Sequence, residues 1–217
     1  SCMSNFDCQK CEDKGCDECG NSFHFQATWN LIVRLADQIS HPSLAVAELI
    51  KNAYDADSTK VLVNMKKSMQ GNPNDCEIVI HDDGHGMSKK DINTKWSNMG
   101  VSANKGNPVS PKGRARQGGF GVGRFGCWKL GQKVTMATKK KGHPIYSLVI
   151  DFSKHPIDTP LEEVMTEILE EPRWAANLFP DGTTGTYLLV EKFNNIMTSH
   201  TDIQKIQAAT RTLQNPF

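Results

Sequence analysis

The chain has 217 residues, of which 38% are hydrophobic and 23% are charged, a balance that suits one ordinary domain with a buried core, alone or with a small appendage. Its 25 basic and 24 acidic residues give a formal charge of +1, which excludes a global electrostatic attraction to nucleic acid or membrane. Residues 1–30 hold neither a cationic start followed by an apolar run nor the stretch of about eighteen apolar residues that a membrane span needs. We therefore expect a cytoplasmic protein, or a nuclear one if the source is eukaryotic.

The first 22 residues differ in composition from the rest of the chain. They are polar, rich in cysteine and without apolar periodicity, so we predict a leader at 1–22 and a globular domain at 23–217. Two CxxC pairs in the leader supply four soft thiolates, the ligand set of a tetrahedral zinc site in a reducing compartment. Only four residues separate the pairs, fewer than in common zinc ribbons, so a single metal would be strained or would recruit Cys2 or His24. The alternative is a flexible leader without metal. The predicted zinc ligands are Cys8, Cys11, Cys16 and Cys19.

The first half of the globular part is predicted to form two helices and then two strands. Apolar residues recur at helical spacing up to the break at His41-Pro42, and proline favours the first position of a new helix. Aliphatic runs on either side of a turn rich in Gly, Asn and Pro then indicate strands. The predicted elements are helices at 23–40 and 42–55 and strands at 61–63 and 77–80.

A long segment without periodicity, at about 97–118, divides this half from the next. It is rich in Gly, Ser, Asn, Lys and Pro, and loops of this length are usually functional or disordered, so we predict a mobile lid. Beyond it, helices and strands alternate without regular βαβ spacing, which favours an α/β sandwich with a mixed sheet over a doubly wound parallel fold. The predicted elements are helices at 121–130, 160–170 and 202–213 and strands at 133–138, 145–151 and 185–190.

Three polar residues of the second helix are spaced to share one side of it. Glu48, Asn52 and Asp55 stand at i, i+4 and i+7, so they project in similar directions. A carboxylate and an amide one turn apart can orient a water for attack and hold a hard cation through a neutral oxygen. Taken alone, the same spacing also fits a solvent-facing side of a helix.

Two glycine-containing segments carry further chemistry. The sequence Asp-Asp-Gly-His-Gly-Met at 82–87 follows the strand at 77–80, where a carboxylate can accept from an exocyclic amine and glycines let the backbone approach a flat ligand. The run at 118–126 leads into a helix, and its N–H groups suit phosphates. Its literal GxGxxG lacks a preceding apolar strand, which excludes a dinucleotide fold, and no GxxxxGK[ST] loop exists.

Taken in order, these segments resemble the motifs of the GHKL ATPases, the superfamily of gyrase, the large heat-shock chaperones, sensor histidine kinases and MutL. The segment at 48–56 resembles the N-box, 82–87 the first glycine box, 118–123 the second, and 185–190 the late strand whose Gly-Thr closes the adenine pocket. The resemblance covers about residues 23–195. It implies a Bergerat fold, which is a two-layer α/β sandwich with a mixed, mostly antiparallel sheet, helices on one face, and ATP held between helix and lid.

The resemblance also assigns roles to individual residues. Glu48 would be the general base that orients the attacking water, Asn52 the Mg²⁺ ligand, and Asp55 partly structural. Asp82 would accept from the adenine amine, and Thr186 would support Asp82 through an ordered water. The other residues expected to contact ATP are Gly84, Gly86, Met87, Lys105, Gly119, Phe120, Gly121, Val122 and Gly123.

Glu48 bears on which branch of the superfamily the chain resembles. Histidine kinases usually lack a glutamate at this position, and the segment at 96–105 looks more like MutL, gyrase, microrchidia and bacterial anti-phage ATPases. We therefore expect Mg²⁺-dependent ATP hydrolysis that closes the lid and joins two copies as a clamp, with DNA or a protein as client and a following transducer domain that supplies a lysine. The alternatives are a histidine protein kinase and a nucleotide- or zinc-binding interaction module without turnover.

Overall fold

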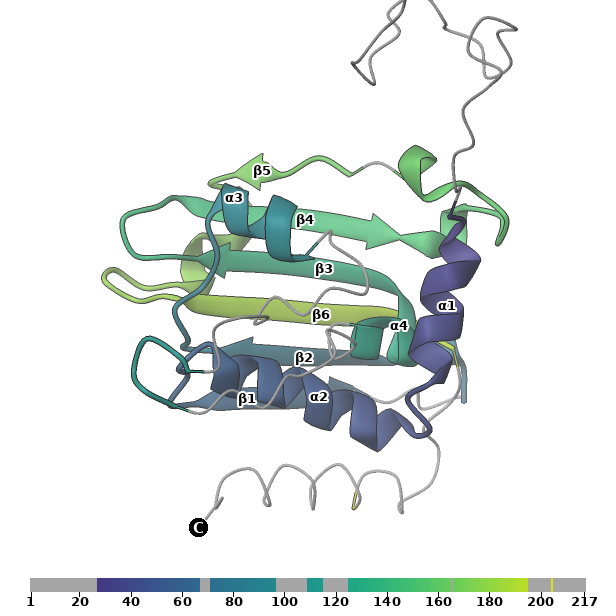
Figure 1. The fold of residues 1–217 in the computed structure, drawn as a ribbon, viewed down its shortest axis with the longest axis horizontal. Helices are drawn as coiled ribbons and strands as arrows, with labels where there is room; N and C mark the ends of the chain where they lie inside the picture. Colours follow the sequence, from purple (N-terminus) through teal and green to yellow (C-terminus); the bar gives the residue numbers. More distant parts are fainter. Residues whose placement is uncertain are drawn as a thin grey trace, which may run out of the picture.

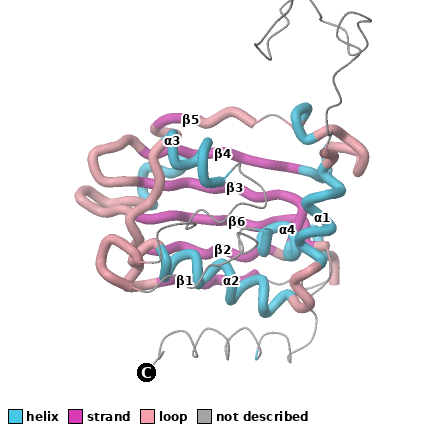
Figure 2. Tube along the Cα trace, in the orientation of Figure 1, coloured by secondary structure: helices cyan, strands magenta, loops and turns pink. Residues whose placement is uncertain are grey.

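The computed structural model describes residues 27–66, 71–96, 109–114, 125–164, 166–194 and 204. Within these ranges, one six-stranded sheet carries the α-helices on one of its faces (Figures 1 and 2). The strands are β1 (Val61–Lys66), β2 (Glu77–Asp82), β3 (Gly131–Lys139), β4 (Ile145–Asp151), β5 (Leu169–Glu170) and β6 (Gly185–Phe193), and the α-helices are α1 (Trp29–Asp37), α2 (Pro42–Asp55), α3 (Lys89–Asp91) and α4 (Gly126–Leu130).

The strand order is β1-β2-β6-β3-β4-β5, and every pairing between the described strands is antiparallel. The prediction of a mostly antiparallel α/β sandwich is confirmed, and no parallel pair occurs among these strands. The last strand, β6, lies between β2 and β3. This insertion places Thr186 directly opposite Asp82, which is distant in sequence.

Alternation along the strands decides which side chains face the helices. In β2, Ile78 and Ile80 are buried and their neighbours are partly exposed, as expected for a strand with one covered face. Helix α2 starts at Pro42, whose ring fits the first helical position. Its buried side includes Val46 and Leu49.

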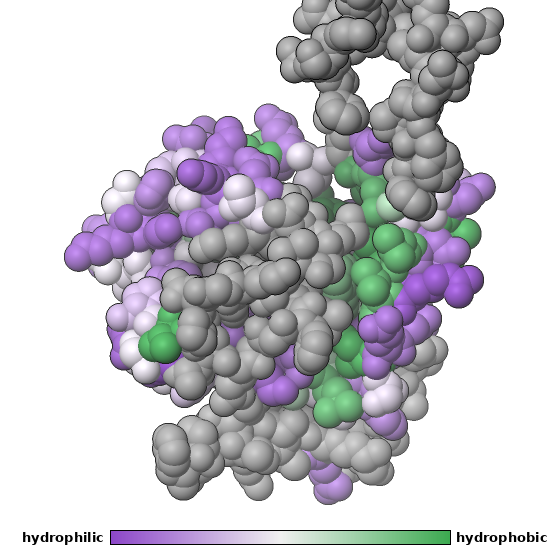
Figure 3. Space-filling view, viewed as in Figure 1, coloured by the Kyte–Doolittle hydropathy of each residue, from purple (hydrophilic) through white to green (hydrophobic). Residues whose placement is uncertain are grey.

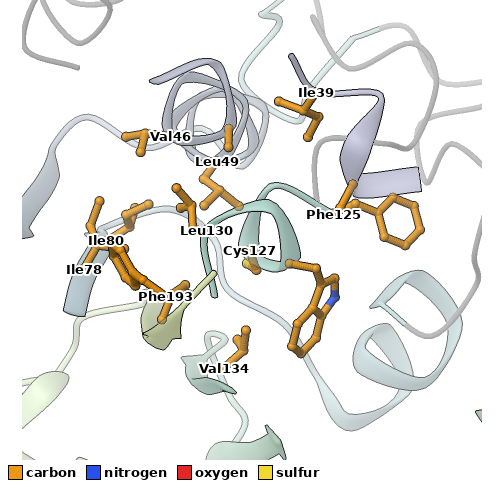
Figure 4. Close-up of a cluster of buried hydrophobic side chains, with 14 of the residues drawn as sticks. Ile39, Val46, Leu49, Ile78, Ile80, Phe125, Cys127, Leu130, Val134 and Phe193 are labelled. Atoms are coloured by element: carbon orange, nitrogen blue, oxygen red, sulfur yellow. The ribbon is translucent and has the colours of Figure 1, made fainter. Parts of the chain in front are cut away.

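The main core lies between the sheet and helices α1, α2 and α4 (Figure 4). Figure 4 shows Leu49 from α2, Cys127 and Leu130 from α4, and the strand residues Ile78 and Val134 gathered in this layer. A second cluster packs Ile92, Met136, Tyr146 and Leu148 under the segment that follows α3. The helix-bearing face therefore has two apolar clusters, and β2 ends beside them.

The molecular surface on this face is uneven. Hydrophobic residues gather over α1 and the start of α2, whereas polar residues cover the strand turns at the opposite edge (Figure 3). Leu31 of α1 and Leu44 of α2 are large hydrophobic residues with exposed fractions of 43% and 50%. On the other face of the sheet, a 3-10 segment at Arg173–Leu178 packs Ala175 against Ala137.

The helix predicted at 160–170 is wrong. Pro160 has an extended backbone and bridges to Thr28, and only one 3-10 turn, Leu161–Glu163, follows. The chain then runs along the sheet edge, where Leu169–Glu170 pairs with β4. The backbone N–H and C=O groups of this segment form hydrogen bonds with the open edge of β4. The spacing of acidic residues, which suggested a helix, carries no information about that edge.

Three other predicted helices extend beyond the described ranges. Helix α1 begins at Trp29 and ends at Asp37, so it is shorter than the predicted 23–40, whose first residues lie outside the described ranges. The helix predicted at 121–130 is observed from Gly126 onward, and almost all of the one predicted at 202–213 also lies outside them. No helix in the described part of the chain is long and apolar enough to cross a membrane.

Candidate functional site

Asp82 ends strand β2 and lies between two neighbouring strands. Val61 of β1 is opposite it on one side and Thr186 of β6 on the other. Its Oδ1 accepts hydrogen bonds from the backbone N–H of Gly84 at 2.8 Å and of Thr186 at 3.3 Å. Within the described residues, no donor reaches Oδ2. The chain therefore fixes one carboxylate oxygen, and the other can accept from a ligand.

The adjacent carboxyl groups of Asp82 and Asp83 differ in their electrostatics. Burial raises the pKa of Asp82 to about 6, against the effect of its two backbone hydrogen bonds, and the charge of Asp83 adds to the rise. Burial also acts on Asp83, but hydrogen bonds from Thr59, Lys60 and Ser58 hold its pKa well below the usual range. Asp83 is thus an ionised structural group, whereas the pKa of Asp82 is raised in the way often found for carboxyls at functional sites.

Glycines allow the segment after Asp82 to lie against neighbouring backbone. Gly86 has φ +63°, and a Cβ there would lie 1.9 Å from the carbonyl oxygen of Lys139. A Cβ on Gly84 would lie 2.8 Å from the carbonyl oxygen of Ala56, just beyond α2. Thr184 Oγ1 also donates to the carbonyl of Gly84 at 2.7 Å. The first glycine box is therefore held in contact with β3, the end of α2 and the start of β6.

Thr138 connects these parts and was not predicted as a site residue. Its fully buried Oγ1 accepts from the backbone N–H of Met87 at 2.9 Å, donates to the carbonyl of Gly185 at 3.0 Å, and lies 3.2 Å from Thr186 Oγ1. Met87 also packs against the cluster around Met136. One sequence signal could have found Thr138, because it occupies an inward-facing position of a strand whose other inward residues are apolar.

The polar residues of α2 lie in different environments. Asn52 is exposed, Glu48 is about one-third exposed, and Asp55 is buried in the last turn with an exposed fraction of 8%. Glu48 Oε1 accepts from Lys51 Nζ at 2.6 Å, one turn further along. Glu48 and Asn52 thus present a carboxylate and an amide to solvent on successive turns, whereas Asp55 is part of the packed end of the helix.

These oxygen atoms suit a hard cation that is bound mainly by the phosphates of a nucleotide. Mg²⁺ prefers oxygen ligands and commonly keeps several waters, so one protein ligand such as the Asn52 amide oxygen is chemically sufficient when phosphates supply others. No group of three or more His, Cys, Asp or Glu side chains in the described part of the chain could hold a metal by itself.

Several predicted site residues lie outside the described residues. They are Lys105, Gly119, Phe120, Gly121, Val122 and Gly123, together with the predicted zinc ligands Cys8, Cys11, Cys16 and Cys19.

Comparison with known proteins identifies the family. Residues 39–178 match the family described as histidine kinase-, DNA gyrase B-, and HSP90-like ATPases. The chain belongs to this ATPase family. The match includes Glu48, Asn52 and Asp82 and ends before Thr186. Strand β6 therefore lies outside the matched region, although it pairs with β2, the strand that carries Asp82.

Two curated proteins that resemble this chain are named for different activities. The chain is 32% identical over 97 residues to a putative type II restriction enzyme, HgiDII, from Herpetosiphon aurantiacus, covering 45% of this chain and 15% of that protein. It is 31% identical over 123 residues to the chaperone protein HtpG from Rickettsia bellii, covering 48% of this chain and 19% of HtpG. The chain thus spans less than one-fifth of the length of these relatives.

Proposed function

We propose that this ATPase-family domain binds Mg²⁺·ATP with the adenine at Asp82 and the phosphates beside α2, and that it hydrolyses the nucleotide. The environment of Asp82 carries the proposal. Its carboxyl is partly buried at a strand end, one oxygen accepts from the backbone N–H groups of Gly84 and Thr186, and no described residue donates to the other. An exocyclic amine is the donor that such an oxygen suits.

The residues of α2 would supply the reactive end of the site. Glu48 is the proposed base, which orients a water toward the terminal phosphate, and Asn52 is the proposed ligand of the cation. When bound, Mg²⁺ would neutralise phosphate charge. Asp55 supports the end of the helix, and Gly84, Gly86, Met87 and Thr186 shape the adenine end. Lys105, Gly119, Phe120, Gly121, Val122 and Gly123 remain proposed phosphate and lid contacts.

The Glu48 position favours hydrolysis over phosphate transfer to a histidine. A partly exposed carboxylate one turn before Asn52 can direct a water, whereas a kinase must keep water from the phosphate. A module that binds nucleotide without turnover has no need of this pair. Transfer of labelled phosphate to a protein histidine would favour the kinase alternative.

We further propose that ATP closes the segment at 97–118 and joins two copies of the domain as a clamp. The names of the relatives suggest two kinds of client, DNA for a restriction enzyme and protein for a chaperone. The cysteine-rich leader at 1–22 would bind zinc as a separate unit. Each of these is a proposal about the whole protein.

A combined binding and turnover experiment tests the central proposal. Calorimetry with Mg²⁺ and a non-hydrolysable ATP analogue should give saturable binding with one site per chain, and EDTA should weaken it. Release of phosphate from ATP should be measured both on this chain and on a longer chain, because the resemblance to GHKL ATPases implies a transducer domain that supplies a lysine. Absence of nucleotide binding both in this chain and in the longer chain would refute the proposal.

A further inference from the structure

The turn between β3 and β4 gathers lysines at one end of the sheet. Lys139 ends β3, Lys140 and Lys141 follow it, and the backbone N–H of His143 donates to the Lys140 carbonyl at 3.0 Å. Gly142 supplies the φ of +77° in this tight turn, a value that glycine adopts readily. Three successive lysines are therefore carried by a short turn that is closed by a hydrogen bond.

The short helix α3 lies over the end of the sheet where β3 turns into β4 (Figure 1), and it brings two more lysines. Asp91 Oδ2 accepts from Lys140 Nζ at 2.7 Å. The same oxygen accepts from the backbone N–H of Ser88 at 3.0 Å and from its hydroxyl at 2.7 Å. Asp91 thus joins α3 to a turn 49 residues away. The other two residues of α3, Lys89 and Lys90, are exposed.

The backbone that carries these lysines is fixed by close contacts. The backbone N–H of Met87 donates to Thr138 Oγ1 at 2.9 Å, and a Cβ on Gly86 would lie 1.9 Å from the carbonyl oxygen of Lys139. The residues just before α3 therefore lie directly against the end of β3. Because this support is already ordered, a partner that binds the lysines has little backbone to order.

These five lysines, which we call the lysine surface, are only partly neutralised. Lys140 is paired with Asp91, and Lys139 Nζ lies 3.8 Å from Glu171 Oε1. The chain has a formal charge of only +1, so any excess of positive charge here is local. Within the described residues, no acidic side chain forms an ion pair with the remaining three lysines, which are Lys89, Lys90 and Lys141.

The chemistry of the lysine surface favours phosphate over other anionic groups. Arginine suits carboxylates because its planar guanidinium binds both oxygens, whereas lysine is a compact point charge that also serves phosphates. Surfaces that bind membranes combine basic with apolar residues. None of the large exposed hydrophobic residues in the described chain belongs to α3 or to the β3–β4 turn. Exposed Glu170 and Glu171 limit the surface on the β5 side, so a partner would approach from the side of α3.

We propose that the lysine surface binds the phosphate backbone of duplex DNA without reading its sequence. A duplex is favoured over a single strand because α3 and residues 139–144 contain no Phe, Tyr or Trp, the rings on which single strands stack their bases. Contacts to phosphates alone carry no sequence information. The inference rests on the part of the proposed function that names DNA as a client, and it does not depend on the nucleotide site.

Fluorescence anisotropy with a short labelled DNA duplex tests the proposal on this chain. The logarithm of the affinity, plotted against the logarithm of the salt concentration, should fall with a slope of about −3, as expected for three phosphate contacts. Lys90→Gln combined with Lys141→Gln removes one cation from each segment. In this double variant the slope should become about −1, and the affinity at low salt should fall about tenfold or more.

Lys66→Gln combined with Lys154→Gln is the matched control. Both lysines are exposed and lie at the opposite end of the sheet, Lys66 as the last residue of β1 and Lys154 just after β4. This variant loses the same charge as the first one, so it controls for the effect of net charge. It should keep the parental salt slope, and its DNA affinity should stay within about twofold of the parent because distant exposed charges are screened by salt.

The outcomes separate this inference from the proposed nucleotide site. Equal losses of affinity in the two double variants, or no loss in either, would overturn the lysine surface as the DNA contact. Displacement of the duplex by polyglutamate at an equal concentration of charges would also overturn it and indicate an acidic protein as the partner. A parent protein that binds the ATP analogue but no DNA overturns this inference alone, and one that binds DNA but no nucleotide overturns the nucleotide site alone.

Discussion

The two ends of the proposed nucleotide site are built in different ways. At the adenine end, Asp82 is fixed by strand pairing, by two backbone donors and by glycines that touch neighbouring backbone. At the reactive end, Glu48 and Asn52 belong to a single helix and are partly or fully exposed, and Glu48 accepts a hydrogen bond from a nearby lysine, Lys51. In the proposed site, adenine recognition would therefore be set by the sheet, whereas the reactive end would depend on what packs beside α2.

The contacts at the adenine end also contribute more to stability than those at the reactive end. An ion pair between partly exposed groups, such as Glu48 and Lys51, contributes about 0–1 kcal/mol. Leaving a buried polar group without its partner costs about 1–3 kcal/mol, and Thr138 holds two such groups at the adenine end. Substitutions at the reactive end should therefore change chemistry with little effect on folding, and those at the adenine end should change binding and stability together.

The largest effect is expected from Glu48→Ala. Loss of a positioned base should lower the single-turnover rate of ATP hydrolysis about 10²–10⁴-fold and leave Mg²⁺·ATP binding nearly intact. Asn52→Ala should instead weaken binding, because the cation loses a protein ligand. Lys51→Met removes the same ion pair without removing the base, so it controls for the lost contact. Hydrolysis by Glu48→Ala at the parental rate would show that another group activates the water.

Asp82→Asn should have the next largest effect. The amide can present a donor to the adenine amine, and loss of a charge-assisted hydrogen bond costs roughly 1.5–3 kcal/mol, or about tenfold to a hundredfold in affinity. Titration calorimetry with ATP measures this directly, and Asp83→Asn, which changes a structural carboxylate next to it, tests whether the effect belongs to the position. Equal ATP affinity in the parent and in Asp82→Asn would show that the adenine amine does not bind this carboxylate.

Thr138→Val should reduce stability more than any change on the exposed side of α2. The valine keeps the shape but leaves the Met87 N–H and the Gly185 carbonyl without their partner, at a cost of about 1–3 kcal/mol in the free energy of unfolding. Chemical denaturation measures the change, and Thr138→Ser, which retains the hydroxyl, should recover most of it. If Thr138→Val is as stable as the parent, the hydrogen bonds do not hold the glycine box.

The smallest effect concerns pH and isolates the charge of Asp82. Its pKa is raised to about 6 in the folded chain, so the ionised acceptor is lost as the pH falls through 6, and ATP affinity should be about tenfold lower at pH 5 than at pH 7.5. The folded chain takes up this proton more readily than the unfolded chain, so the contribution of Asp82 to stability without nucleotide rises as the pH falls from above 6 toward 4. In Asp82→Asn, the part of the pH dependence that comes from Asp82 should disappear. Any pH dependence that remains in this variant comes from other groups, including the phosphates of ATP.

Local patterns were sufficient for much of the fold. Helix α2 was predicted with its observed ends, because Pro42 marks its start and apolar residues fill one side. The strands at 77–82 and 185–193 were predicted at 77–80 and 185–190, so their starts agree and their ends differ by a few residues. The segment at 160–170 was predicted incorrectly, because its acidic spacing resembles a helix and the open edge of β4, which pairs with it, is invisible in the sequence.

The sequence by itself determined the types of residue in the proposed site and their order, because motif spacing along one chain records which groups share a helix side or a strand end. Only the tertiary structure decided which of them meet. It placed β6 beside β2 so that Thr186 contacts Asp82, buried Thr138 between Met87 and Gly185, and attached Ser110 to Asp57. These contacts join residues far apart in sequence, and no local period or propensity encodes a pairing that depends on strand order and on the packing of a distant segment.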